Sequence, residues 1–214
     1  MHDMFQTLGK LGIVPVIKLE DPDSAVQLGR ALVDGNLPVA EVTFRTASAA
    51  ESIKRLRKEL PKLLVGAGTV LTLAQAEAAV EAGASFAVTP GFNPRIVEYF
   101  IGKGIPVIPG VNSPTQVEMG LELGLQVLKF FPAEASGGTR MLKALYGPYA
   151  EVKFVPTGGI DVGNLADYLN LPNVIACGGS WMVKEDFIKQ GRFSDIAAAC
   201  RAGVELAASC RKKR

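Results

Sequence analysis

An acid and a base lie close together in one short apolar segment, the run from Val39 to Arg45. If this run is a β-strand, its alternation places Glu41 and Arg45 on the same face. Charged side chains are costly to bury in a strand unless they have a partner or a function. Glu41 could transfer protons, and Arg45 could bind an anionic group of a substrate. The alternative is an internal ion pair between these two residues at the end of the strand.

A lysine stands in a second apolar segment, the run from Leu125 to Pro132. Strand alternation puts Lys129 on the same face as Phe131, where little water is expected. Removal from water disfavours the ammonium form, and the neutral amine is the form that attacks a carbonyl carbon. The alternative is a strand-end lysine whose ammonium group reaches solvent. Glu41 and Arg45, which are expected at the same edge of the sheet, favour the chemical interpretation.

Glycine-rich turns follow the last two apolar runs of the chain. Backbone N–H groups in such turns, together with a short helix N-terminus, can bind a phosphate group. In parallel barrels the loops after strands seven and eight commonly form this kind of site, although tight turns alone would also explain the glycines. The residues of the two turns are Thr157, Gly158, Gly159, Gly178, Gly179 and Ser180.

Turns after two earlier runs carry the same residue types. The segments are Gly66-Ala67-Gly68-Thr69 and Thr89-Pro90-Gly91. Glycine lets the backbone approach a ligand closely, and the threonines add hydroxyl groups, but both types are also ordinary turn residues.

The apolar runs recur along the whole chain, with room for one helix and two short loops between them. They begin at Gly12, Val39, Leu63, Ser85, Ile105, Leu125, Val152 and Asn173. Most are continuously apolar and rich in valine and isoleucine, which is typical of strands covered on both faces. Helix starts are predicted between them at Asp21-Pro22, Thr72 with Gln75, Asn93-Pro94 and Ser113-Pro114, and helix ends at Gly35, Gly83 and Gly124.

Eight strand–helix units predict an α/β fold, a (β/α)8 TIM barrel that forms a single domain over residues 1–214. A short helix near Met4–Lys10 is expected before the first strand, and a last helix near Ser194–Ser209. A doubly wound open sheet is the alternative, but the turn after the first run lacks the glycine pattern G-x-G-x-x-G that usually marks it. In a barrel the chemistry gathers at the carboxyl ends of the strands, where the candidate residues lie.

Composition excludes several classes of function. The chain has 214 residues and a single histidine, His2, so it cannot supply the placed imidazoles of a Ser-His-Asp triad or a histidine-rich metal site. The net charge is 23 − 21 = +2, but residues 211–214 form a basic tail that is expected to be partly disordered. Without its four charges the balance is 19 − 21 = −2. No nucleic-acid partner is therefore expected. No segment is long and apolar enough to predict a membrane partner, and a cytoplasmic location is expected.

Five motifs in order give the chain a resemblance to the family of 2-dehydro-3-deoxy-phosphogluconate aldolases and 4-hydroxy-2-oxoglutarate aldolases. The resemblance extends from about Gly12 into the last helix, and Thr89 is a small departure, where many relatives carry serine. The motifs are EVTFRT (41–46), VGAGTV (65–70), KFFPAE (129–134), PTGGI (156–160) and GGSW (178–181).

The resemblance implies a class I aldolase that needs no cofactor and no metal. Its substrate would be a small 2-oxo acid, either 2-dehydro-3-deoxy-6-phosphogluconate or 4-hydroxy-2-oxoglutarate, and its usual assembly a homotrimer. Lys129 would form the Schiff base and Glu41 would transfer protons, with Arg45 and Thr69 at the substrate carboxylate. The remaining implied site residues are Pro90 and Phe131 along the site, Thr157 near the far hydroxyl, and Gly158, Gly159, Gly178, Gly179 and Ser180 around the phosphate.

The residues alone leave other functions open. One is a phosphate-binding barrel isomerase or synthase without a covalent intermediate, and another is an aldolase for a related sugar acid phosphate. A third is a barrel that binds a small phosphorylated ligand for regulation.

Overall fold

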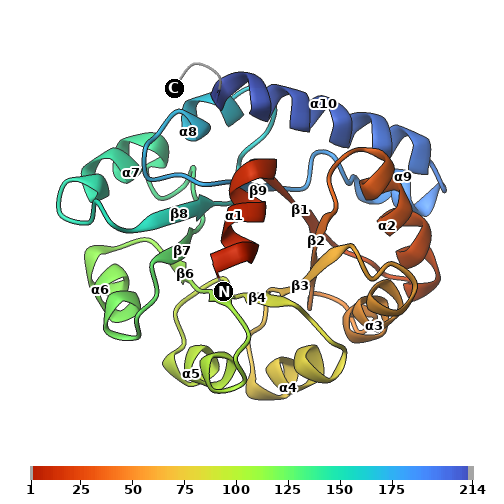
Figure 1. Cartoon of the computed structure of the whole chain (residues 1–214), viewed down its shortest axis with the longest axis horizontal. Coiled ribbons are helices and arrows are strands. Elements are labelled where there is room, and N and C mark those ends of the chain that lie inside the picture. The colour runs from red at the N-terminus through yellow and green to blue at the C-terminus, as the bar shows by residue number, and fades with distance from the viewer. Residues whose placement is uncertain (1, 212–214) are drawn as a thin grey trace.

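Strands and helices alternate along the chain in a computed structural model that describes residues 2–211. Figure 1 shows the strands in the middle and helices α2 to α10 around them. The strands are β1 (Ile13–Ile17), β2 (Val39–Thr43), β3 (Leu64–Gly68), β4 (Phe86–Val88), β5 (Val107–Ile108), β6 (Gly110–Val111), β7 (Val127–Phe130), β8 (Lys153–Pro156) and β9 (Cys177–Gly179). The α-helices are α1 (His2–Leu11), α2 (Ala25–Asp34), α3 (Ala49–Glu59), α4 (Leu73–Glu81), α5 (Pro94–Gly102), α6 (Pro114–Glu122), α7 (Gly138–Tyr146), α8 (Leu165–Leu169), α9 (Glu185–Lys189) and α10 (Phe193–Arg211).

All paired strands run parallel, which confirms the predicted α/β class. One sheet has six strands in the order β5-β4-β3-β2-β1-β9, and the other has three in the order β6-β7-β8. Two isolated bridges, Phe154 with Val174 and Thr157 with Gly178, connect β8 to the segment of β9. The run predicted as one fifth strand is divided into β5 and β6 by Pro109, which has no N–H group to donate to a neighbouring strand.

The helix starts follow the expected signals with some differences. Thr72 caps α4 by accepting a hydrogen bond from the N–H of Gln75, and Pro94 begins α5. The segment at Asp21-Pro22 first forms a short 3₁₀ turn, and α2 begins only at Ala25. Both terminal helices extend slightly beyond their predicted bounds. These helices pack outside the strands, and β2 is buried at all its residues.

Helix α1 closes the amino-terminal end of the strands. Figure 1 shows it crossing the centre of the molecule in front of the strands. Leu8 of α1 is fully buried and contacts a small interior cavity together with Val14, Phe86 and Val155. The carboxyl ends of the strands, where no such helix of residues 2–211 lies across the interior, are the expected place for the site.

Three further predictions concern the basic tail, membrane-spanning segments and the cysteines. Of the predicted basic tail, residues 212–214 lie outside the described residues. None of the helices between residues 2 and 211 combines the length and the apolar character needed to cross a membrane. The three cysteines, Cys177, Cys200 and Cys210, are buried, and no disulfide joins any two of them.

Candidate active site

A cavity of about 260 Å³ opens at the carboxyl ends of the strands. Every residue predicted for the site lines it except Glu41. The loops after β3, β4, β7, β8 and β9 all contribute, which is the arrangement expected for parallel strands. The lining residues are Val16, Arg45, Thr69, Pro90, Lys129, Phe131, Thr157, Gly158, Gly159, Ile160, Gly178, Gly179 and Ser180.

Lys129 lies at the inner end of this cavity. The residue is only 4% exposed, so its amine does not reach bulk solvent as the alternative interpretation required. Its Nζ is 3.6 Å from Oε1 of Glu41 and 4.9 Å from the centre of the Phe131 ring. Its backbone N–H donates to the carbonyl of Pro109, which fixes the strand beneath it. The amine therefore combines one acidic neighbour, one aromatic neighbour and an open side toward the cavity.

Glu41 lies deeper than the sequence predicted. It is 3% exposed and contacts a separate interior cavity of about 10 Å³, which Lys129 and Thr157 also line. Among the described residues, Glu41 Oε1 and Thr157 Oγ1 are buried without a hydrogen-bond partner. Such atoms are costly inside a protein, and they are typical of sites that bind or transfer something.

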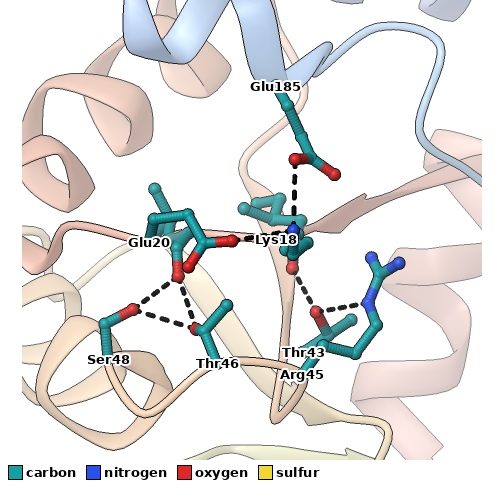
Figure 2. A network of polar contacts seen from close by, with 9 residues as sticks. Lys18, Glu20, Thr43, Arg45, Thr46, Ser48 and Glu185 are labelled. Atoms are coloured by element: carbon teal, nitrogen blue, oxygen red, sulfur yellow. Dashed lines mark hydrogen bonds and ion pairs between the residues drawn. The ribbon is translucent and has the colours of Figure 1, made fainter.

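Arg45 does not pair with Glu41 among residues 2–211, so the expected alternative of a Glu41–Arg45 ion pair is wrong. Instead, Arg45 Nε donates to Oγ1 of Thr43 at 3.0 Å, as Figure 2 shows. Arg45 lies between the main cavity and a neighbouring cavity of about 480 Å³. Its guanidinium is thus available to an anion in the main cavity.

The glycine turns approach the cavity through their backbones. Gly158 and Gly159 have φ values of 101° and 81°, a region that disfavours residues with a side chain. The N–H of Glu134 donates to the carbonyl of Gly158 and holds this turn against the loop after β7. Sequence reasoning missed a second support, in which the hydroxyl of buried Tyr168 donates to the Glu134 carboxylate. Desolvation, with this hydrogen bond, raises the pKa of the Tyr168 phenol, which stays neutral.

Gly178 and Gly179 make close contacts of another kind. A methyl group at Gly178 would collide with the side chain of Thr157, and one at Gly179 with the indole ring of Trp181. Neither glycine has a left-handed φ, so space rather than backbone conformation requires glycine here.

Charged residues surround the neighbouring cavity. Lys18 at the end of β1 forms ion pairs with Glu20 at 2.7 Å and with Glu185 at 3.3 Å (Figure 2). These contacts raise the pKa of the Lys18 amine, and the Lys18 contact lowers the pKa of the Glu20 carboxyl. The sequence does not predict a role for Lys18, because ordinary surface ion pairs have no pattern that distinguishes them.

Two further observations bear on the choice of site. A larger cavity of about 740 Å³ lies at the opposite, amino-terminal end, between α1 and the starts of several strands, and no predicted site residue lines it. Between residues 2 and 211 there is no group of three or more His, Cys, Asp or Glu residues that could hold a metal ion. The buried Lys129 amine and the Thr157 hydroxyl, which has no partner among the described residues, line the 260 Å³ cavity, which is therefore the candidate site.

Comparisons with known proteins agree on one family. The family model described as KDPG and KHG aldolase matches residues 4–199. The 2-dehydro-3-deoxy-phosphogluconate aldolase of Treponema pallidum is 50% identical over 206 residues, which are 96% of this chain and 98% of that protein. The enzyme of the same name from Haemophilus influenzae is 46% identical over 96% of this chain and 97% of its own length.

A solved structure is also closely similar. It is KDPG aldolase from Legionella pneumophila with pyruvate captured at low pH as a covalent carbinolamine intermediate. The TM-score is 0.90 at 42% identity, and the similarity covers 92% of this chain and 96% of that one.

Proposed function

The chain belongs to the KDPG and KHG aldolase family, and from this membership we propose that it cleaves 2-dehydro-3-deoxy-6-phosphogluconate into pyruvate and glyceraldehyde 3-phosphate. The enzyme is a carbon–carbon lyase that works through a Schiff base. One observation carries the proposal for this chain's own residues. The Lys129 amine is almost fully buried, faces the cavity, and lies 3.6 Å from Glu41 Oε1, a buried atom without a hydrogen-bond partner among the described residues.

Lys129 is the nucleophile of the proposed reaction. Its neutral amine adds to the C2 carbonyl to form a carbinolamine, and loss of water gives an iminium ion. The iminium accepts the electron pair of the C3–C4 bond as that bond breaks, so an enamine forms and no free carbanion is needed. Protonation at C3 and hydrolysis then release pyruvate and restore the amine.

Glu41 moves the protons of this sequence. Its carboxylate removes the C4 hydroxyl proton as the aldehyde leaves, directly or through one water, and the resulting acid returns a proton to C3 of the enamine. The distance of 3.6 Å between Glu41 Oε1 and Lys129 Nζ, the atom that would bear the intermediate, supports this role. Because Glu41 lies behind the amine, it can act without occupying the space of the substrate.

The substrate ends are bound by the other cavity residues. Arg45 offers planar donors to the carboxylate next to C2, with Thr69 beside it, and Pro90 and Phe131 form the apolar walls. Thr157 faces the distal hydroxyl. The phosphate group lies against the backbones of the turns at 158–159 and 178–180.

We also infer that the two sheets form one closed (β/α)8 barrel in a single domain. Glu41 of β2 and Lys129 of β7 are in contact although these strands are not neighbours in either sheet, which places the two strands across a common interior. The bridges from β8 to β9, and the continuation of β5 into β6 through Pro109, support closure on both sides. A homotrimer and a cytoplasmic location stay predictions.

A second substrate is suggested by the relatives. The Escherichia coli protein named KHG/KDPG aldolase is 42% identical over 193 residues. We propose that 4-hydroxy-2-oxoglutarate is also cleaved, to pyruvate and glyoxylate. The glyoxylate half has no phosphate, so it leaves the glycine turns unoccupied.

Reduction by borohydride in the presence of pyruvate tests the reaction class. We expect an irreversible adduct, which peptide mass mapping locates at Lys129. Lys129→Met removes the amine at similar length and abolishes the adduct. The matched control is Lys153→Met, because Lys153 is another strand lysine whose Nζ donates to the carbonyl of Pro172 outside the site.

The outcome also decides between the other functions. An isomerase or synthase without a covalent step forms no adduct, and a regulatory barrel binds a phosphorylated ligand without releasing pyruvate or an aldehyde. An adduct that persists in Lys129→Met, or its absence in the wild-type protein, would refute the proposed mechanism.

A further inference from the structure

Arg45 is held by one neighbour inside the protein. Its only hydrogen bond among the described residues is the one from Nε to Oγ1 of Thr43, at 3.0 Å. We infer that Thr43 is a positioning residue that orients the Arg45 guanidinium toward the substrate carboxylate. This inference rests on the proposed function, in which Arg45 binds that carboxylate.

Thr43 is fixed on its other side. The residue is 0% exposed, and its hydroxyl donates to the carbonyl of Ile17 at 2.7 Å. A hydroxyl has one proton, so this bond leaves only oxygen lone pairs to face Arg45. Ile17 ends β1 and pairs with β2, the strand of Thr43, so the acceptor for Arg45 is attached to two hydrogen-bonded strands. Figure 2 shows the contact between Thr43 and Arg45.

The bond at Nε determines which donors remain. With Nε engaged, the two terminal nitrogens of the guanidinium are free, and together they match the two oxygens of a carboxylate. A bidentate contact of this kind fixes both the position and the rotation of the 2-oxo acid, and therefore the angle at which Lys129 meets C2.

The neighbouring cavity shows what Thr43 prevents. Arg45 lies on the boundary between the two cavities, and the acids Glu185 and Asp186 line the second one. An arginine side chain without a fixed Nε has several rotamers. Glu185 is already paired with Lys18, so Asp186 is the carboxylate of this cavity that would attract Arg45 away from the substrate. Thr43 therefore favours the orientation in which the Arg45 guanidinium faces the substrate cavity over one in which it forms an ion pair in the neighbouring cavity.

The test measures the pyruvate concentration that gives half-maximal borohydride trapping. Thr43→Val replaces the hydroxyl by a methyl group of similar size. We expect this concentration to rise about tenfold, as when one hydrogen bond to a charged group is lost, while the trapping rate at saturating pyruvate stays near that of the wild type. Thr43→Ser keeps the hydroxyl and is expected to restore binding to within about twofold.

Thr46→Val is the matched control. The Thr46 hydroxyl also donates to a carbonyl just after β1, that of Leu19, and its other hydrogen-bond partner is Ser48 rather than the Arg45 side chain. Its loss therefore removes a comparable hydrogen bond and leaves pyruvate binding unchanged. If Thr43→Val does not fold, Thr43→Ala removes the hydroxyl without the added methyl group, with the same expected result.

A double variant separates positioning from general damage. In an Arg45→Ala background, Thr43→Val is expected to have no additional effect on pyruvate binding, because its target is absent. The inference is overturned if Thr43→Val weakens binding equally without Arg45, if Thr43→Ser is as weak as Thr43→Val, or if Thr43→Val binds pyruvate like the wild type. If the wild type traps no pyruvate, the proposed function itself fails and the inference falls with it.

Discussion

Gly68 provides the space that the Glu41 carboxylate occupies. A methyl group at Gly68 would lie 2.5 Å from Oε1 and 2.6 Å from Cγ of Glu41. The backbone of Gly68 does not have a left-handed φ, so alanine can adopt this conformation. The collision with Glu41 is then the main effect of the substitution. Gly68→Ala therefore acts on the position of Glu41, and it leaves the identity of every titratable group unchanged.

The size of the effect follows from these distances. An ordinary van der Waals contact begins at 3.4 Å, so the carboxylate has to move by about 3.4 − 2.5 = 0.9 Å. A misplacement of about 1 Å in a catalytic group costs on the order of a hundredfold in rate. We expect a loss of this size in proton transfer, together with a loss of stability of about 1 to 3 kcal/mol from overpacking.

Exchange of the methyl protons of pyruvate in D₂O, followed by NMR, measures the affected step. Exchange requires the iminium and then a base at C3, whereas borohydride trapping requires only the iminium. Gly68→Ala should therefore slow exchange by about a hundredfold and change half-maximal trapping by less than about threefold. Gly91→Ala is the matched control, because it adds a methyl group in the loop after β4 where no atom lies within 4 Å.

Two results would refute this reasoning. If folded Gly68→Ala exchanges protons at the wild-type rate, Glu41 is not the base. If trapping is lost in parallel with exchange, the substitution disturbs Lys129 itself rather than the position of the acid.

Three further predictions concern other parts of the molecule. The methyl group of Gly179→Ala collides with Trp181, so the variant should raise KM for the phosphorylated substrate by about tenfold and leave pyruvate trapping unchanged. Equal effects on KM and on trapping would exclude a phosphate-binding role for this turn. Arg45→Lys keeps the charge but loses the planar pair of donors, so KM should rise by about tenfold with kcat nearly constant, and an unchanged KM would contradict the carboxylate contact. Burial raises the pKa of the Cys200 thiol from 9.0 to about 12, so the folded state holds this proton more tightly than the unfolded state does. The contribution to the free energy of unfolding is therefore fully present below pH 9 and is lost as the pH rises toward 12. Denaturant midpoints of the wild type should therefore fall more steeply between pH 8 and 10.5 than those of Cys200→Ala, by the equivalent of about 2 kcal/mol, and parallel curves would show that the thiol is not buried.

Local pattern was enough to predict where the site lies. Strand alternation put Glu41 and Lys129 on interior faces, because a residue's face in a strand depends only on its number along that strand. The convergence of the parallel strand ends then brought the turns at 157–159 and 178–180 to the same place. These features follow from the repeat of strands and helices, which the apolar runs reveal directly.

The partners of the charged groups could not be predicted in this way. An ion pair between Glu41 and Arg45 was the expected alternative because both lie in one predicted strand. In the structure β2 ends at Thr43, Glu41 faces Lys129 across the interior, and Arg45 bonds to Thr43. Which pair forms depends on side-chain rotamers and on space made by distant residues, and neither is visible in the spacing. By alternation Thr43 shares a face with Glu41 and Arg45, yet nothing in its type distinguishes a positioning hydroxyl from an ordinary strand threonine.

The acid at the centre of the site depends on residues that have no chemistry of their own. Gly66 leaves room for the Phe86 ring as Gly68 does for Glu41, so β3 presents almost no side chain to the interior at this level. Phe86 and Leu8 of α1 then complete the apolar lining around Glu41 and Lys129. The apolar lining keeps water away from both side chains, so the carboxyl and the amine face each other in a medium of low dielectric constant. The arrangement of Glu41 and Lys129 therefore requires both the glycines of β3 and the packing of α1 at the opposite end of the molecule.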